Sequence, residues 1–263
     1  MSGKRYKSKI ISGRHIFAVL IAVFALAGGY AAYNLITTEQ NYNEARNEYS
    51  GLRIHAPYSE VNPGRSDNYE PEEAEQETVQ ETRLDLASIN PDYIGWILIE
   101  ETGIDYPMVQ GADNTKYLNT TFTGERNPSG TIFMDSHIIN GFSGFAILHG
   151  HNMKDGSMFA GLHSLLDSDL LSDEMLPALP DIIIYTSDNN MLLYQIFAVK
   201  LTDIDDEVFQ LPEKEFYAMS EYFAVYGFTG EVLQESIDIL VLSTCTNGGR
   251  NERLIVLASR NRE

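Results

Sequence analysis

The apolar and polar positions divide the chain into three stretches with different patterns. Residues 16–36, IFAVLIAVFALAGGYAAYNLI, are uncharged and apolar, and a run of about 20 such residues can cross a hydrocarbon core as a helix. Residues 37–83 are polar and show little apolar periodicity. From residue 84 onward, short apolar segments alternate with turn residues. The pattern predicts a transmembrane helix, a solvated stalk and a folded domain.

The folded stretch carries the signature of β structure. Its strand-like segments are residues 96–99, 106–109, 131–134, 145–148, 181–185, 191–199, 237–242 and 254–258. Many short strands separated by turns indicate an all-β barrel or sandwich, and about 180 residues suffice to enclose a core. Two segments, 158–166 and 213–226, have helical apolar spacing. In the second, one face is formed by Phe216, Met219, Tyr222, Phe223 and Tyr226.

Charge orients the apolar run. The basic residues ahead of it are Lys4, Arg5, Lys7, Lys9 and Arg14, which places the N-terminus in the cytoplasm and the remainder outside. The run is longer than the apolar region of a cleaved signal peptide, so we expect an uncleaved anchor. The expected organisation is a cytoplasmic tip (1–15), a transmembrane anchor (16–36), an extracytoplasmic stalk (37–83) and a domain over 84–263.

The net charge of the chain limits the macromolecules that it is expected to bind. The formal net charge is −20, and the cationic tip makes the rest of the chain more acidic still. Such a chain repels polyanions, so nucleic acid is not expected as a partner. The run EPEEAEQE at residues 70–77 has almost nothing to bury, and it is expected to be solvated and extended by self-repulsion.

Cys245 is the single cysteine of the chain. Exported proteins usually pair their cysteines, so a solitary thiol is either inert and buried or reactive. It follows the apolar segment 237–242 and precedes a loop, and its surroundings, STCTN, are polar on both sides. A thiol at the end of a rigid strand next to a loop is placed as a nucleophile requires. The context therefore favours a reactive cysteine.

Such a thiol needs a base, and the sequence offers His149 and His151 directly after the segment 145–148. The other four histidines lie beside the apolar run, in the stalk, in a helical segment or in a separate loop. An H-x-H pair also suits a metal, but no further His or Cys cluster accompanies it, so no metal site is expected. Arg253 begins a strand returning from the Cys245 loop and can bring a guanidinium to an oxyanion; Arg250 is its rival.

Together these stretches resemble the sortases, and more narrowly the class B sortases. The resemblance covers residues 84–263 and rests on GHNMKDGSMF (150–159), LSTC (242–245) and Arg253. Further matching stretches are NPDYIGW (90–96), IDYPMVQ (104–110), GTIFMD (130–135) and the helix before the cysteine-bearing strand. The resemblance implies a closed eight-stranded β-barrel with added helices, and a transpeptidase reaction that needs no cofactor and no metal.

The resemblance also assigns roles. Cys245 matches the family's nucleophile, His151 its catalytic histidine and Arg253 its arginine, while Asn114 and Leu118 match residues that line the sorting-signal groove. Ser243, two residues before the nucleophile, is a further candidate for substrate contact. His149 falls outside the family position, and Val241 departs from the family's TLxTC pattern, which has threonine there.

The expected function is that of a single-pass membrane enzyme with an extracytoplasmic catalytic domain. Its expected substrates are surface proteins bearing a C-terminal N-P-x-T-x-like sorting signal, and its acceptor an amine of a cell-wall peptide, of a lipid-linked precursor or of a pilin lysine.

Two other functions remain open at this level. One is an extracytoplasmic cysteine peptidase or wall amidase. Papain-like and related wall hydrolases place cysteine before histidine, whereas His151 precedes Cys245 here; wall L,D-transpeptidases carry a His-Gly pair directly before the cysteine, where this chain has Ser243-Thr244. The other is a non-catalytic surface adaptor with a vestigial thiol, which alkylation kinetics would distinguish.

Overall fold

The structure is a computed structural model, and it describes residues 13–60, 84–166, 179–213, 216–228 and 237–262. The chain forms two compact units, Met1–Asn43 and Glu44–Glu263. The helix α1 (Gly13–Arg53) contributes residues to both. All of the strands that the structure describes lie in the second unit.

The N-terminal part of α1 is apolar and exposed. Phe24 and Leu26, for example, leave about three quarters of their surface uncovered, at 74% and 75%. By length and composition this is the one helix within the described ranges that could cross a membrane, a test that a signal sequence near the N-terminus also passes. The helix is therefore compatible with the predicted membrane anchor.

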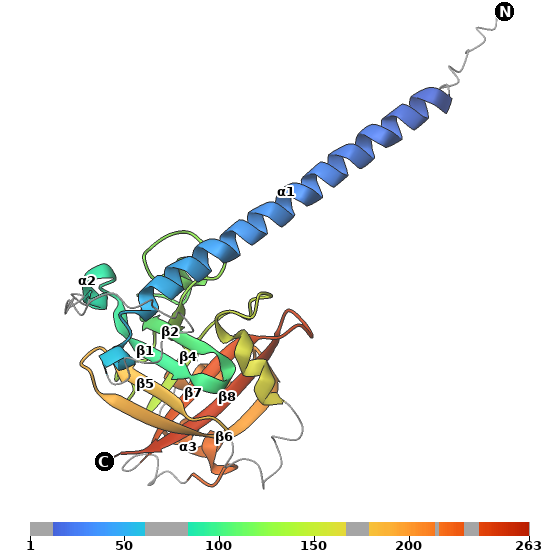
Figure 1. Cartoon of the computed structure of the whole chain (residues 1–263). Helices are drawn as coiled ribbons and strands as arrows, with labels where there is room; N and C mark the ends of the chain where they lie inside the picture. The colour runs from blue at the N-terminus through green and yellow to red at the C-terminus, as the bar shows by residue number, and fades with distance from the viewer. Residues whose placement is uncertain (1–12, 61–83, 167–178, 214–215, 229–236, 263) are drawn as a thin grey trace, which may run out of the picture. The chain divides into compact units, whose positions relative to one another are not determined.

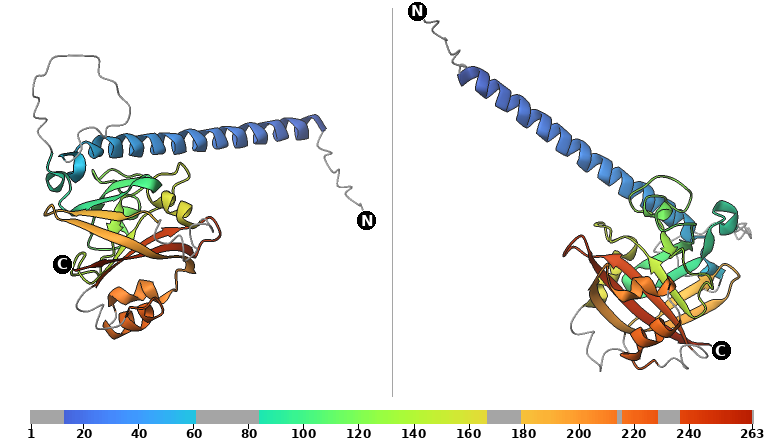
Figure 2. Two further views of the ribbon diagram at one scale, coloured as in Figure 1. Left: turned by 60° about the horizontal axis from the view of Figure 1, so that its bottom comes forward. Right: turned by 180° about the vertical axis from the view of Figure 1, so that it is seen from behind.

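Eight strands close into a barrel in the order β1-β2-β3-β4-β7-β8-β6-β5 (Figures 1 and 2). They are β1 (Tyr93–Ile99), β2 (Ile104–Val109), β3 (Ile132–Met134), β4 (Phe145–His149), β5 (Ile182–Thr186), β6 (Met191–Asp203), β7 (Ile237–Cys245) and β8 (Glu252–Asn261). Two neighbouring pairs, β2–β3 and β4–β7, are parallel, and the others are antiparallel. The prediction of a closed eight-stranded barrel is confirmed, and each strand-like segment forms a strand.

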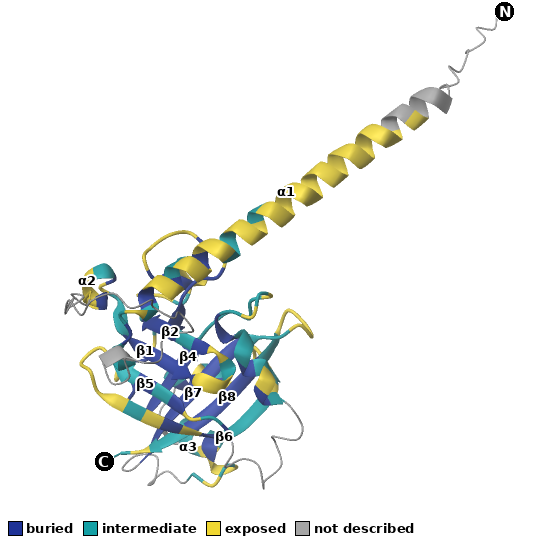
Figure 3. Cartoon of the chain, viewed as in Figure 1, coloured by how far each residue is buried: buried dark blue, intermediate teal, exposed yellow. Residues whose placement is uncertain are grey.

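The core lies inside the barrel and under the elements that cover it, as the dark blue strands of Figure 3 show. Strand β7 has the longest buried run of the described strands: each residue from Ile237 to Thr244 is buried, and Cys245 is the first that is not. Covering both faces explains why this strand reads as a continuous apolar run rather than an alternating one. The thiol therefore stands where a rigid strand emerges from the core.

The C-terminal end of α1 falls within the stretch predicted to be a solvated stalk (37–83), yet it buries several side chains. Ala45, Tyr49 and Leu52 follow a four- and three-residue spacing, and all three are buried in the second unit, as is Ala56 beyond the helix. One apolar residue per turn on one face is enough to pack the end of a helix against a domain. So few apolar positions do not give a clear periodicity in a sequence whose other residues are polar. The acidic run 70–77 lies outside the described residues, and the predicted domain boundaries stay predictions.

Short helices precede β1 or lie between the strands. The first kind are η1 (Pro57–Glu60) and α2 (Leu86–Ile89); the second are η2 (Glu100–Thr102), η3 (Lys116–Leu118), η4 (Phe159–Leu166), η6 (Glu207–Glu213) and α3 (Phe216–Ala224). The predicted helix at 158–166 is a 3-10 helix, because Phe159, Leu162 and Leu165 recur every three residues and all are buried. Within the predicted helix at 213–226, α3 buries Phe223 and packs Tyr222 against the core. The side chain of Phe216 is outside the described ones.

Candidate active site

A cavity of about 300 Å³ opens where strands β4, β7 and β8 meet the connections between strands. Its lining includes all six residues given a catalytic or substrate-binding role in the sequence analysis, which are Asn114, Leu118, His151, Ser243, Cys245 and Arg253. The remaining lining residues are Thr131, Phe133, Asp135, His149, Gly150, Ile204, Phe209 and Thr244. Folding thus brings to one hollow a set of residues that spans 140 positions of the chain.

Strand pairing sets the residue that carries the thiol opposite one that carries a guanidinium. Cys245, the last residue of β7, is the register partner of Arg253 on the antiparallel strand β8. Arg253 Nη1 donates to the backbone oxygens of Arg250, at 3.2 Å, and Glu252, at 3.0 Å. These bonds hold one edge of a group that has five N–H donors. Arg250 is exposed and does not line the cavity.

His151 is held through its backbone and through one ring nitrogen. The N–H of the preceding residue, Gly150, donates to the backbone oxygen of Ser243 at 3.1 Å. The backbone oxygen of His151 accepts from the Phe159 N–H at 2.9 Å. The ring nitrogen Nε2 lies 2.7 Å from the backbone oxygen of Leu118. A carbonyl only accepts, so Nε2 carries the proton and donates. Nδ1 is then the nitrogen available for proton exchange with a reactant.

His149 belongs to a different set of contacts. Its Nε2 lies 3.2 Å from Asp135 Oδ2, and the same oxygen accepts from Asn114 Nδ2 at 2.8 Å. Asn114 Oδ1 accepts in turn from the Ser136 N–H at 2.8 Å. Both ends of the Asn114 amide are thereby oriented, which leaves one N–H for a ligand.

Asp135 is the charged centre of this network. Burial opposes its ionisation, but hydrogen bonds from His149 and from the backbone and ring of His137 outweigh that effect and hold the pKa of Asp135 below its usual range. The carboxylate is therefore ionised throughout the neutral range, where it accepts from Asn114 and from the two histidines.

The two histidines of the H-x-H pair therefore have separate partners, Asp135 for His149 and Leu118 for His151. The His149 ring also lies against Phe133 and Phe209, with centroids 5.2 Å and 6.4 Å away. Across the described ranges of the chain, no group of three or more His, Cys, Asp or Glu residues is arranged to hold a metal ion.

Sequence reasoning missed several lining residues. Asp135 is one of them: it follows β3 directly, next to the end of β4, where Phe133 pairs with His149. A polar residue at the end of a buried strand was the available signal. Thr244 could not be identified in this way. Its hydroxyl is buried beside Cys245 without a hydrogen-bond partner, which only the folded structure reveals. Ile204 and Phe209 come from the connection after β6 and carry no motif.

Comparison with known proteins accounts for this arrangement. The model of the sortase domain family matches residues 97–261. Sortase B of Listeria monocytogenes is 30% identical over 251 residues, which cover 91% of this chain and 92% of the relative. The chain belongs to the sortase family. As a class B sortase it is a cysteine transpeptidase of the cell wall.

Solved structures agree with this assignment of the sortase. The structure of sortase B from Listeria monocytogenes is 31% identical with a TM-score of 0.54, and covers 67% of this chain and 98% of its own. Sortase B from Clostridium perfringens is 27% identical with a TM-score of 0.57, and the alignment covers 68% of this chain and 98% of that one. Both chains are covered almost completely, so the likeness extends over their whole fold.

Proposed function

We propose that this sortase joins proteins to a cell-wall amine through a thioester on Cys245, with His151 as general acid and base and Arg253 as the oxyanion partner. The observation that carries the proposal is the convergence of these three side chains on one cavity. The register pairing of Cys245 with Arg253 supports it further. In acyl transfer by a cysteine, a thiolate, a proton carrier and a cationic donor are the parts required.

In the first step, the Cys245 thiolate attacks the carbonyl carbon of a threonine in the sorting signal. A C–S bond forms, and negative charge develops on the carbonyl oxygen, where the Arg253 guanidinium stabilises it. The C–N bond of the scissile amide then breaks. The leaving amine takes a proton from the His151 imidazolium, which leaves a thioester and a neutral imidazole.

In the second step, an acceptor amine attacks the thioester carbon. His151 takes the proton that the amine loses, the C–S bond breaks and the thiolate is released as a new amide forms. The thioester conserves the free energy of the cleaved amide, so neither step consumes ATP. The enzyme returns to its thiolate–imidazolium state.

Substrate recognition is assigned to Asn114, Leu118 and Ser243. Asn114 offers one N–H with its amide oriented by Asp135 and Ser136, which suits a backbone oxygen of an extended peptide. Leu118 exposes 36% of its surface and gives the groove an apolar contact. By class, the expected signal is an N-P-x-T-x pentapeptide, and the expected acceptors are an amine of a wall peptide, of its lipid-linked precursor or of a pilin lysine.

The apolar segment of α1 is assigned as a single-pass anchor, with the basic N-terminus in the cytoplasm and the catalytic domain outside. This topology places the enzyme where exported substrates and wall precursors meet.

A peptide-library assay tests the proposal. The full chain in detergent is incubated with N-P-x-T-x peptides, and intact mass spectrometry follows the protein. We expect a mass increase equal to the acyl fragment on the wild type and none on Cys245→Ala. Transpeptidation by Cys245→Ala would refute the assignment. Acylation that only water resolves, whichever amine is added, would indicate a cysteine peptidase instead, and no acylation by any peptide would indicate a non-catalytic protein.

A further inference from the structure

We propose that Tyr49, near the C-terminal end of α1, is a positioning residue for His151, an inference that rests on the catalytic role proposed for that histidine. Tyr49 is buried, with 3% of its surface exposed, and it does not line the cavity. Tyr49 makes two contacts that bear on the position of the imidazole. One is to the loop whose Leu118 carbonyl accepts the hydrogen bond from the ring. The other is to Tyr106 on β2, which holds the loop that carries His151.

The first connection runs to the acceptor of the ring proton. Tyr49 Oη donates to the Gly130 oxygen at 2.5 Å and lies 3.2 Å from Thr131 Oγ1. Gly130 has φ of +58°, and a Cβ there would stand 2.3 Å from the Tyr117 oxygen and 2.9 Å from the Leu118 oxygen. Only glycine fits so close an approach in this conformation. The backbone held by Tyr49 therefore lies directly against the carbonyl that orients His151.

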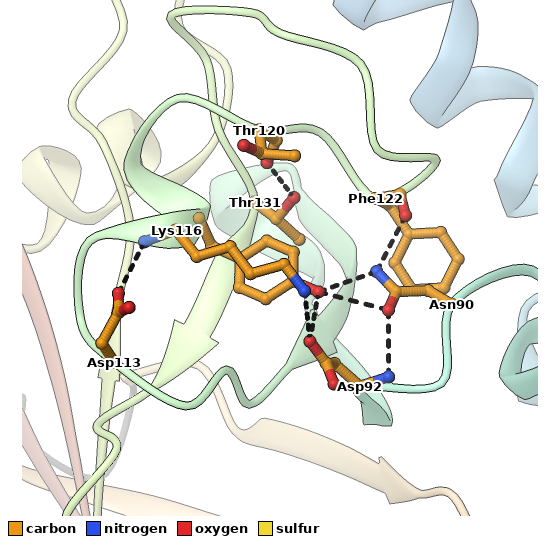
Figure 4. Close-up of polar contacts among 8 residues, drawn as sticks. Asn90, Asp92, Asp113, Lys116, Thr120, Phe122 and Thr131 are labelled. Carbon is orange, nitrogen blue, oxygen red and sulfur yellow. Dashed lines mark hydrogen bonds and ion pairs between the residues drawn. The ribbon is translucent and has the colours of Figure 1, made fainter.

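The rest of this loop is fastened independently to the barrel side (Figure 4). Asn90 Nδ2 donates to the Phe122 oxygen at 2.9 Å, and Lys116 Nζ pairs with Asp92 at 2.6 Å. Within the loop, Thr131 Oγ1, which also lies 3.2 Å from Tyr49 Oη, donates to the Thr120 backbone oxygen at 2.8 Å. Loss of the Tyr49 hydroxyl should therefore leave the loop folded while releasing its segment next to Leu118.

The second connection runs to the loop that bears His151. The Tyr49 ring meets the Tyr106 ring edge to face, with centroids 5.2 Å apart and planes at 84°. Tyr106 Oη accepts from the Met158 N–H at 3.1 Å, and Met158 forms a β-bridge with Asn152, the residue after His151. Arg46 adds an exposed ion pair to Asp155 in the same loop at 3.4 Å, a contact of small energetic weight.

The hydroxyl of Tyr49 is suited to a fixed donor role. Burial raises the pKa of Tyr49 above its usual value, so it stays protonated at any pH where the enzyme works. A displacement of about 1 Å in a reacting group can lower a rate by about 10²-fold. We therefore expect Tyr49→Phe, which keeps the ring contact and removes the donor, to lower kcat about 10- to 100-fold with little change in KM.

The test uses the full chain in detergent and the fluorogenic N-P-x-T-x library peptide that the wild type cleaves fastest. Tyr58→Phe is the matched control, because Tyr58 Oη donates to Asp105 at 2.8 Å on another part of the surface that receives the helix. Imidazole ¹⁵N NMR adds a specific readout. Recorded at a pH where the imidazole is neutral, the wild type should show the His151 proton on Nε2, and Tyr49→Phe should show a mixture of tautomers. If kcat, KM, the pH profile and the His151 signals of Tyr49→Phe are the same as those of Tyr58→Phe, the inference is overturned.

Two further measurements keep the outcome decisive. If Tyr49→Phe does not fold, 3-fluorotyrosine is placed at position 49, which retains the ring and the donor. It should move the ¹⁵N signals of His151; unmoved His151 signals would overturn the inference. A wild type that forms no acyl-enzyme, or full activity of His151→Ala, would refute the proposed function itself, which separates the two failures.

Discussion

Cys245 and Arg253 lie opposite each other in the register of β7 and β8, each at the end of its strand that faces the connecting loop. An antiparallel pair joined by a short loop returns the chain to the same end of the sheet. The guanidinium of Arg253 is thus carried by a rigid strand. In the sequence it follows the thiol of Cys245 by eight residues.

This pairing predicts a large kinetic effect of Arg253→Ala. Loss of an oxyanion donor typically costs about 10²–10³ in rate, so we expect kcat/KM for peptide cleavage to fall by that factor. Arg253→Lys should recover only part, because a lysine cannot reproduce the planar fork of donors. Arg250→Ala is the control and should stay within about twofold of the wild type. A greater loss for Arg250→Ala would assign the role to the loop arginine.

The separate partners of the two neighbouring histidines predict different mutational sensitivities. His151→Asn removes the proposed proton carrier and should lower the acylation rate by about 10²–10⁴. His149→Gln can still reach Asp135 with an amide and should lose about tenfold or less, through a shift of Asn114. Rapid-mixing mass spectrometry of the acyl-enzyme measures both rates. The reverse order would show that His149 is the acid and base.

Asp135 predicts a specific pH dependence of stability. Its pKa is lower in the folded chain than in the unfolded one, so its stabilisation is complete above the unfolded pKa of about 3.9 and is lost as the pH falls below that value. Asp135→Asn should therefore be less stable than the wild type by about 1.5–3 kcal/mol at pH 6, with a difference that shrinks below pH 4. Urea unfolding across this pH range measures it, with the exposed Asp181→Asn as control. A gap that stays constant between pH 3 and pH 6 would contradict the prediction.

A second buried carboxylate predicts a loss of stability that spares catalysis. Asp238 is fully buried, and its Oδ1 accepts from Arg262 Nε and the Gly144 N–H at 2.5 Å and 2.6 Å, while Arg260 Nη2 lies 2.6 Å from Oδ2. Removing one partner of such a cluster costs about 3–5 kcal/mol. Asp238→Ala should unfold at a correspondingly lower urea concentration.

The same substitution should leave kcat/KM at low temperature near the wild-type value. Asp238 is the second residue of β7 and Cys245 the last, so about 23 Å of strand separates them. Asp205→Asn, on an exposed turn, is the control for stability. A catalytic defect in folded Asp238→Ala would show that β7 transmits a distortion along its length.

Local patterns determined much of this protein. Apolar runs placed the eight strands, because burying an apolar segment dominates the free energy of folding wherever it lies in the chain. The change from IDILVL to STCTN put Cys245 at a strand end, and Arg253 at the start of the next strand followed from the short loop between them. The N-terminal apolar helix and the family motifs could also be identified from the sequence. The 3-10 geometry of η4 was present as a three-residue period but is easily taken for a helix of the usual kind.

Tertiary structure alone decided which partners the site residues have. The bond from His151 to Leu118 spans 33 positions, that from Asn114 to Asp135 spans 21, and that from Tyr49 to Gly130 spans 81. Such contacts depend on barrel closure and strand register, and a single sequence records neither, since hydrogen-bond partners are chosen by position in space. Periodicity reports whether a side chain is buried; only the assembled fold determines which side chain it meets there.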